Sequence, residues 1–339
     1  MKRTVNIPVV DPFCADDDPE MPSIAIALDP VEVQRQFEYR LGHLAGEDGY
    51  FQLREIRVAR YKPERRCVIE YDLEQPEAMT LLGKVRVRRF GKSGYRLLSA
   101  FWNAGFDADA PDGISVPEPV GTVSKFRMWL QRKVAGRAAS ALLAAPGGVD
   151  LARRIAEAAH KVHRAGVPTE RRHTMADELR ILHERLPAVG RAEPQWADRI
   201  ERLLYACDRL GAATPEPVPR GIHRDFYADQ VIVDGPRLHL LDFDLYCEGD
   251  PALDIGNFLG HLTEQSLRTL GDPEALAHVE GALEERFVEL SGGQTCPAIH
   301  AYKLLTLARH VHLSTLYPER RSFTRSLLEL CEELFKVKC

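Results

Sequence analysis

Polar residues arranged around a predicted β-hairpin restrict the fold of this chain more than any other feature of its sequence. Two apolar runs, Val231–Val233 and Leu238–Phe243, flank the turn signal Asp234-Gly235-Pro236, and we expect both runs to be strands. The residues that carry chemistry occur around them in a fixed order: His223, Asp225, Gln230, Asp242, Asp250 and Asp254. A His-x-Asp triplet arises often by chance, whereas the whole set in a strand–turn–strand setting indicates a functional site.

The same stretch is densely acidic. Between Asp225 and Asp254 there are eight acidic residues and one basic residue, Arg237, which gives a net charge of −7. Such a charge density beside apolar strands is costly unless cations neutralise part of it. Mg²⁺ is the natural candidate.

The overall composition narrows the class of partner. At 339 residues the chain is long enough for two domains, each with a core of its own. Its net charge of −5 and pI near 6.2 argue against general affinity for nucleic acid or an anionic membrane, since both require a basic surface. We therefore expect no nucleic-acid or membrane partner, and the sequence does not indicate the oligomeric state.

Cysteine usage and the absence of a targeting pattern indicate a cytoplasmic location. The seven cysteines are an odd number and include no Cys-x-x-Cys pair, so reduced thiols are expected. No apolar run approaches the ~20 residues of a membrane span, and the amino terminus lacks the apolar core of a signal peptide.

The first part of the chain is predicted to be rich in β-structure. Residues 1–28 contain five acidic residues and several prolines and are expected to be a loosely held arm. Asp29-Pro30 signals the start of a helix. Three strand-like runs follow as an antiparallel meander: Ile56–Tyr61, Cys67–Leu73 and Met79–Val87.

After these strands, the pattern predicts a helix that ends at Gly105 and then two further strand-like runs, Val120–Thr122 and Phe126–Leu130. From Gly136 onward the pattern is mostly helical. We therefore predict an α+β protein with two lobes. A small β-rich lobe covers residues 29–130, and a larger, mainly helical lobe covers residues 131–339.

The ordered motif resembles that of kinases, and its continuation resembles the aminoglycoside phosphotransferase and choline kinase superfamily. In that superfamily a Gly-Asp-Pro-x-x-Asp-hydrophobic motif follows the metal-binding Asp, and Gly249–Ile255 matches it. The resemblance also includes Tyr61–Cys67, Leu82–Val85 and Trp129–Gln131, so it spans roughly residues 55–260. It implies a two-lobed protein-kinase-like fold.

The resemblance implies a transfer of the γ-phosphate of ATP to a hydroxyl of a small molecule, such as a sugar, an aminoglycoside or a choline-like alcohol. Asp225 matches the catalytic base, and Gln230 and Asp242 match the Mg²⁺ ligands. Lys84 matches the lysine that contacts the α- and β-phosphates. The remaining nucleotide contacts are expected at Leu130, Gln131 and Lys133 in the hinge, and at Arg65 and Arg66 in the first strand turn.

The acceptor substrate is expected between the catalytic loop and the C-terminal helices. The candidate contacts there are Tyr227, Asp229, Asp244, His261 and Glu264. His223 matches a residue that shapes the catalytic loop. We expect Asp254 to be a helix cap and Asp250 to hold its loop, and we interpret His160 and His163 as structural or surface residues.

Three departures from the family pattern leave alternatives open. Gln230 stands where the family has Asn, and no glycine-rich loop joins the first two strands. From Val85 to Phe106 there is no acidic partner for Lys84, and five residues are basic: Arg86, Arg88, Arg89, Lys92 and Arg96. That basic stretch is either a solvated face or a site for a phosphorylated or carboxylated substrate. A nucleotide-binding pseudokinase and a nucleotidyl transferase are the alternative functions.

Overall fold

The computed structural model describes residues 7–44, 52–75, 78–87 and 92–336. The chain divides into two compact units, Met1–Ala135 and Gly136–Cys339. The expected boundary after residue 130 falls inside the strand Met128–Arg132, and the division comes five residues after it. No helix among the described residues is long and apolar enough to cross a membrane.

The N-terminal unit is built on one six-stranded sheet, with the order β1-β2-β3-β4-β7-β6. The predicted meander is confirmed, since β2, β3 and β4 pair antiparallel in sequence order. The strands are β1 (Val9–Val10), β2 (Gln52–Lys62), β3 (Arg66–Gln75), β4 (Met79–Arg86), β6 (Pro119–Val123) and β7 (Met128–Arg132). The unit also contains the helices α1 (Ser23–Ala27) and α3 (Lys92–Phe101) and the short strand β5 (Ile114–Ser115).

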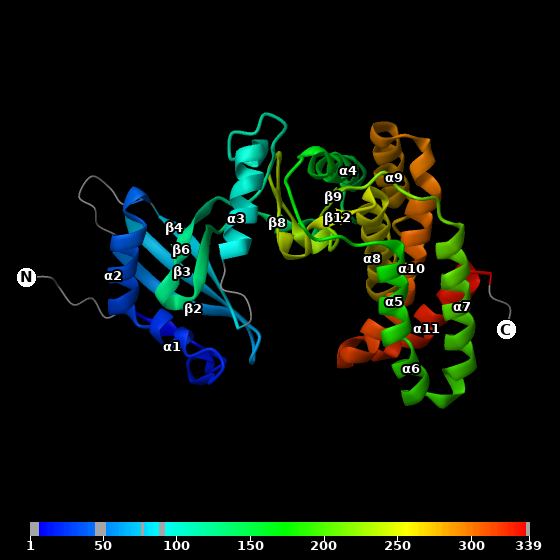
Figure 1. Cartoon of the computed structure of the whole chain (residues 1–339), viewed down its shortest axis with the longest axis horizontal. Helices are drawn as coiled ribbons and strands as arrows, with labels where there is room; N and C mark the ends of the chain where they lie inside the picture. Colours follow the sequence, from blue (N-terminus) through cyan, green and yellow to red (C-terminus); the bar gives the residue numbers. More distant parts are fainter. Residues whose placement is uncertain (1–6, 45–51, 76–77, 88–91, 337–339) are drawn as a thin grey trace, which may run out of the picture. The chain divides into compact units, whose positions relative to one another are not determined.

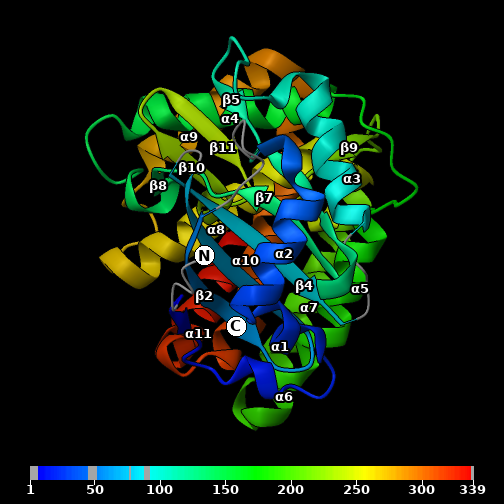
Figure 2. The ribbon, with the colours of Figure 1, turned by 90° about the vertical axis from the view of Figure 1, so that its left-hand side faces the viewer.

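Helix α2 (Pro30–Arg40) begins where the sequence predicts. The Asp29 side chain accepts hydrogen bonds from the backbone N–H groups of Val31 and Glu32, at 3.0 and 3.4 Å, and so caps the helix. Figure 2 shows α2 lying across the sheet. Its buried residues Val33 and Phe37 pack into the core of this unit.

The structure differs from the prediction of a loosely held arm. Residues 1–6 lie outside the described residues, but Ala15, Met21 and Ile24 are buried in the core beneath the sheet. The Asp18 carboxylate accepts hydrogen bonds from the Tyr61 hydroxyl at 2.8 Å and from the Glu64 N–H at 2.9 Å. Apolar residues spaced among the acidic ones anchor this segment, and the count of acids and prolines did not reveal them.

The C-terminal unit is mainly helical, as predicted (Figure 1). Its helices are α4 (Gly148–Arg164), α5 (Met175–Arg185), α6 (Pro187–Ala192), α7 (Ala197–Ala213), α8 (Pro251–Leu270), α9 (Ala277–Ser291), α10 (Cys296–Leu316) and α11 (Thr324–Leu334). The predicted hairpin is β10 (Val231–Asp234) and β11 (Arg237–Leu240), and β10 also pairs with β8 (Arg137–Ala138). A second ribbon pairs β9 (Arg220–Ile222) with β12 (Cys247–Gly249).

Two glycines let α8 and α10 lie side by side at close range (Figure 1). A Cβ atom on Gly256 would lie 2.5 Å from the Tyr302 Cβ and 2.7 Å from the Ile299 carbonyl oxygen. A Cβ on Gly260 would lie 2.7 Å from the Thr306 Cβ. Because these neighbours include backbone and Cβ atoms, no side-chain rotation can make room, and the helices need glycine at both positions.

We predict that Gly256→Ala lowers the free energy of unfolding by about 1–3 kcal/mol, because the added methyl forces α8 and α10 apart. The matched control is Gly281→Ala in α9, where an added Cβ meets no atom within 4 Å. That change should be neutral or stabilise by up to ~1 kcal/mol through helix propensity. Urea unfolding of the two variants checks the prediction, and equal effects would contradict it.

Candidate active site

One buried carboxylate fixes the loop that carries the predicted catalytic base. The Asp254 side chain is fully buried (0% exposed) and accepts hydrogen bonds from the backbone N–H groups of His223 at 2.8 Å and Arg224 at 2.6 Å. The ring Nε2 of His163 on α4 lies 2.8 Å from the same carboxylate. The loop after β9 is therefore tied to α8 and α4 immediately before Asp225.

The prediction that Asp254 caps a helix is wrong. Asp250 is the N-cap of α8, since its carboxylate accepts a hydrogen bond from the Ala252 N–H at 2.9 Å. Asp254 lies one turn into the helix, where its side chain can reach the neighbouring loop. His163 is structural, in accord with its interpretation from the sequence, and holds this carboxylate.

Asp225 presents a carboxylate that makes no hydrogen bond to any residue the structure describes. Burial raises the pKa of Asp225, the nearby Asp242 adds to the increase, and His223, Arg309 and Arg224 oppose it. A partly exposed carboxylate with a raised pKa is better suited to accept a proton than an ordinary surface aspartate.

Asp242 has the properties of a cation ligand. It follows β11 in the left-handed region of backbone conformation, with φ of 56°, which is unfavourable for a residue other than glycine. Its Oδ1 atom is buried and has no hydrogen-bond partner among the described residues. A buried carboxylate oxygen without a donor is costly unless a cation meets it, so this side chain fits the expected Mg²⁺.

The Gln230 side chain is oriented by a neighbour on the same loop. Its Nε2 donates to the Tyr227 hydroxyl at 3.2 Å, which leaves the carbonyl oxygen available as a hard ligand. The backbone carbonyl of Gln230 accepts from the Leu241 N–H at 2.8 Å, and so places Gln230 beside the residue that precedes Asp242. Among the described residues no group of three or more His, Cys, Asp or Glu side chains is arranged to hold a metal.

Tyr227 and His261 come together, whereas the other three predicted acceptor contacts have different partners. The Tyr227 and His261 rings stack with centroids 4.6 Å apart. Asp229 accepts a hydrogen bond from the Ser140 hydroxyl, and the buried Glu264 forms an ion pair with Arg268 at 2.9 Å. The backbone carbonyl of Asp244 accepts from Arg171 Nη1 at 2.5 Å. Of the five predicted acceptor contacts, Tyr227 and His261 are thus the two that contact each other.

In the N-terminal unit, the pairing of β4 with β7 brings the predicted nucleotide contacts together. Lys84 pairs with Trp129 across the two strands, and its Nζ lies 4.8 Å from the centre of the Trp129 ring. Leu130 and Gln131 follow on β7 and are buried. Lys133 forms an ion pair with Glu70 on β3 at 2.8 Å.

The turn between β2 and β3 is a concentration of positive charge. Arg65 is exposed, and the buried Nε of Arg66 has no hydrogen-bond partner among the described residues. The charges of Arg66, Arg65 and Arg60, together with some burial, lower the pKa of Lys62. Repulsion among these cations favours an anion at the turn. Of the later basic stretch, Arg88 and Arg89 lie outside the described residues.

Comparison with known families identifies the chain. The family described as "Phosphotransferase enzyme family" matches residues 71–289, more than half of the sequence. The chain belongs to this phosphotransferase family. The region matched contains Lys84, the catalytic loop and Asp242, so the predicted family is confirmed. Comparison with curated proteins finds none that matches the chain.

Solved structures confirm the predicted kinase-like fold. A choline/ethanolamine kinase family protein from Mesorhizobium loti has a TM-score of 0.56 at 14% identity, over 93% of this chain and 94% of that protein. A mutant of aminoglycoside phosphotransferase APH(4)-Ia, in complex with AMP-PNP and hygromycin B, has a TM-score of 0.56 at 14% identity, over 90% and 97%. Choline kinase from Cryptosporidium parvum has a TM-score of 0.56 at 10% identity, over 91% and 96%.

Sequence reasoning missed a polar network that supports the loop of Asp225 from the side of α8 and α10. Asn257 Nδ2 donates to the carbonyl of Phe226, the residue after Asp225, at 2.9 Å. Asn257 Oδ1 accepts from Arg309 on α10, and Arg309 also pairs with Glu178 at 3.3 Å. The ring of His173 lies 2.6 Å from Glu178. Asn257 could have been noticed in the sequence, because it lies seven residues after Asp250. No sequence pattern pointed to Arg309 or Glu178.

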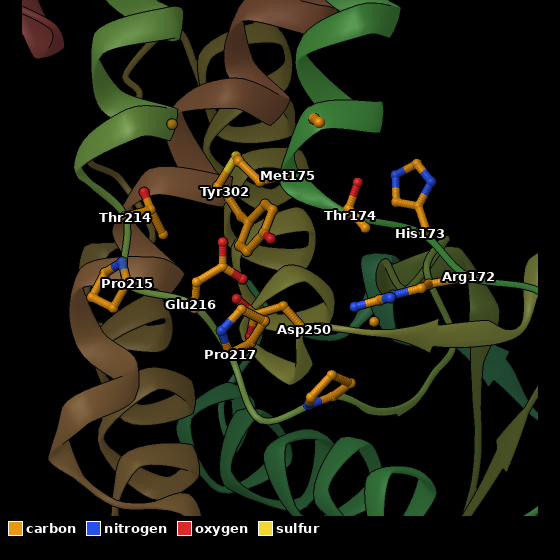
Figure 3. Close-up of a pocket in the computed structure, with 14 residues that line it drawn as sticks. Arg172, His173, Thr174, Met175, Thr214, Pro215, Glu216, Pro217, Asp250 and Tyr302 are labelled. Atoms are coloured by element: carbon orange, nitrogen blue, oxygen red, sulfur yellow. The ribbon is translucent and has the colours of Figure 1, made fainter.

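The network ends at a cavity of about 330 Å³ in the C-terminal unit. His173 lines it, together with the α8 cap Asp250 and Tyr302 of α10. Figure 3 shows the side chains of Glu216, Asp250 and Tyr302 turned toward one another. Burial raises the pKa of the Asp250 carboxyl, and the Ala252 N–H and Tyr302 oppose that increase. Residues that cap α8 and belong to the network behind the Asp225 loop therefore line this cavity.

We predict that Asp254→Asn lowers the free energy of unfolding by about 2–4 kcal/mol, because an amide cannot satisfy two buried N–H groups and His163 at once. Asp198→Asn on α7 is the matched control, since Asp198 is exposed and should change stability by less than ~0.5 kcal/mol. Urea unfolding measures both. Equal stability of the two variants would show that Asp254 does not brace the loop.

Proposed function

We propose that the protein is an ATP- and Mg²⁺-dependent phosphotransferase that moves the γ-phosphate to a hydroxyl group of a small molecule. The observation that carries the proposal is the pair of carboxylates around the β10–β11 hairpin. Asp225 makes no hydrogen bond to any described residue, and Asp242 has a buried oxygen without a donor. The Asp225 carboxylate is suited to accept a proton, and the Asp242 carboxylate is suited to bind a cation.

Asp225 acts as the base in this proposal. As the acceptor oxygen attacks phosphorus, its proton passes to the Asp225 carboxylate, and the raised pKa makes that carboxylate a better proton acceptor. Asp254 and Asn257 position Asp225 indirectly, by fixing the backbone on both sides of it. Positioning and electrostatic stabilisation supply most of the catalysis in phosphoryl transfer.

Asp242 and Gln230 would hold Mg²⁺, which neutralises charge on the phosphates when it is bound. Lys84, oriented against the Trp129 ring, and the cations Arg65 and Arg66 would bind phosphate oxygens. Leu130, Gln131 and Lys133 would offer backbone groups to adenine. A cytoplasmic enzyme with access to ATP and Mg²⁺ fits this scheme.

We predict that Asp225→Asn lowers kcat by ~10²–10⁴-fold, because the amide cannot accept the proton. The same variant should have a higher melting temperature than the parent above the raised pKa, where the charged carboxylate destabilises the fold. That difference should shrink as the pH falls through the raised pKa, since the parent carboxyl then becomes neutral in the folded state. Release of labelled phosphate product and thermal unfolding at several pH values measure the two effects.

Full activity of Asp225→Asn would contradict the role of Asp225. A loss of activity with a lower melting temperature at every pH would indicate damage to the fold instead. The two readouts together separate a catalytic role from a structural one.

We predict that Gln230→Leu raises the Mg²⁺ concentration needed for half-maximal activity by at least ~10-fold, because leucine fills the space but offers no oxygen. Gln230→Glu keeps an oxygen at the same chain length and is the matched control. Titration of activity with Mg²⁺ measures both. An unchanged Mg²⁺ requirement in the leucine variant would remove Gln230 from the metal site.

Two alternatives have distinct outcomes in the same assays. A pseudokinase would be stabilised by ATP with Mg²⁺ and would transfer no label to any hydroxyl compound. A nucleotidyl transferase would attach AMP to its product, which mass spectrometry detects as a different mass increase from that of a phosphate.

A further inference from the structure

The cavity in the C-terminal unit is separate from the residues proposed for phosphate transfer. Its wall is formed by the start of α5, the end of α7 with the loop that follows it, the start of α8, and Tyr302 of α10. The described residues that line it do not include Asp225, Gln230 or Asp242. The occupant of this cavity is therefore independent of the phosphate acceptor.

Two polar side chains of the cavity wall are almost completely buried. Asp250 is 7% exposed and Tyr302 is 3% exposed, and Figure 3 shows both turned toward Glu216. The Asp250 carboxylate accepts a hydrogen bond from the Ala252 N–H at 2.9 Å. A buried carboxylate is costly to keep charged unless a cation or further donors meet it. The wall at Asp250 therefore favours a ligand with a positive charge.

Prolines hold a second carboxylate over the same cavity. The loop between α7 and β9 contains Pro215-Glu216-Pro217-Val218-Pro219, and each proline fixes its own φ and keeps the residue before it extended. Glu216 is exposed and forms no ion pair with any residue that the structure describes. We call Glu216 and Asp250 the cavity carboxylates. Two acids turned toward each other repel unless a cation lies between them, and a stiff loop loses little entropy when it binds one.

The basic groups at the cavity have acidic partners of their own. Arg172 lines the cavity, but its Nε lies 3.9 Å from a carboxylate oxygen of Glu248, and its side chain is 67% exposed. The ring of His173 lies 2.6 Å from Glu178, which also pairs with Arg309. These pairs leave the charge of the cavity carboxylates without a counterion among the described residues.

We propose that the cavity binds a small organic amine, with its ammonium group between the two cavity carboxylates. An ammonium group has three N–H donors, which suits two carboxylates and the hydroxyl of Tyr302. The carbon chain of the amine lies against Met175, Pro217 and the Tyr302 ring, which also line the cavity. A volume of about 330 Å³ is near the lower end of the range for small-molecule sites, so the ligand is small.

The experiment uses three compounds that share a four-carbon chain: butylamine, butanol and butyrate. Binding is measured at pH 7, where the amine is protonated, and at fixed ionic strength. The readout is the NMR signal of the Met175 methyl group, at up to ~10 mM ligand. Met128, which is buried in the N-terminal unit, is the internal reference. We expect butylamine to bind at least ~10-fold more tightly than butanol, and butyrate to leave the Met175 signal unchanged.

Glu216→Gln should weaken the binding of butylamine by at least ~10-fold, because the amide keeps the shape of the side chain and loses its charge. The matched control is Glu201→Gln, which removes an exposed acid of α7 about three helical turns before Gly211, where α7 reaches the cavity. This control should leave the affinity unchanged. The far-ultraviolet circular dichroism of each variant verifies that it is folded.

Equal affinity for butylamine in the parent and in Glu216→Gln overturns the proposal, and so does butanol that binds as tightly as butylamine. A Met175 signal that butylamine does not move, or moves only as much as that of Met128, also overturns it. Because the samples contain no ATP, a failure of phosphate transfer would leave the result of this experiment intact.

Discussion

The rest of the candidate active site depends on the buried carboxylate of Asp254. A charged group with no exposure is tolerated in a protein only when hydrogen bonds and neighbouring donors compensate for the lost water. Here the donors are the two consecutive backbone N–H groups of His223 and Arg224 and the ring of His163. The need to satisfy this carboxylate therefore holds the loop, α8 and α4 in one arrangement.

These hydrogen bonds explain how the candidate site keeps two residues in an unfavourable backbone conformation. Arg224 and Asp242 both have positive φ, 70° and 56°, which costs on the order of 1–3 kcal/mol for each residue. The two residues lie next to the proposed base and at the proposed metal ligand. Strain of this kind persists only where surrounding contacts fix the backbone, and Asp254 with Asn257 provides such contacts on both sides of Asp225.

The sequence was sufficient for the features that depend on local pattern. Strand-like apolar runs and the Asp-Gly-Pro turn predicted the meander and the β10–β11 hairpin, and the ordered motif predicted the family. The sequence was insufficient for features that depend on which residue lies on the other side of a tertiary contact. Asp250 and Asp254 are both plausible caps from spacing alone, and only the packing of α8 against the loop separates them. Arg309, which follows Asp225 by more than eighty residues in the sequence, joins the candidate site from α10.

Charge illustrates the same limit. The stretch from Asp225 to Asp254 has a net charge of −7, which suggests an acidic site throughout. The acids, however, are distributed among a helix cap, a brace, a hairpin turn and the proposed metal ligand, whereas the helices supply arginines around His261 and His310. Because Coulomb interactions weaken with distance and with screening, the nearest unpaired charge determines what a ligand meets.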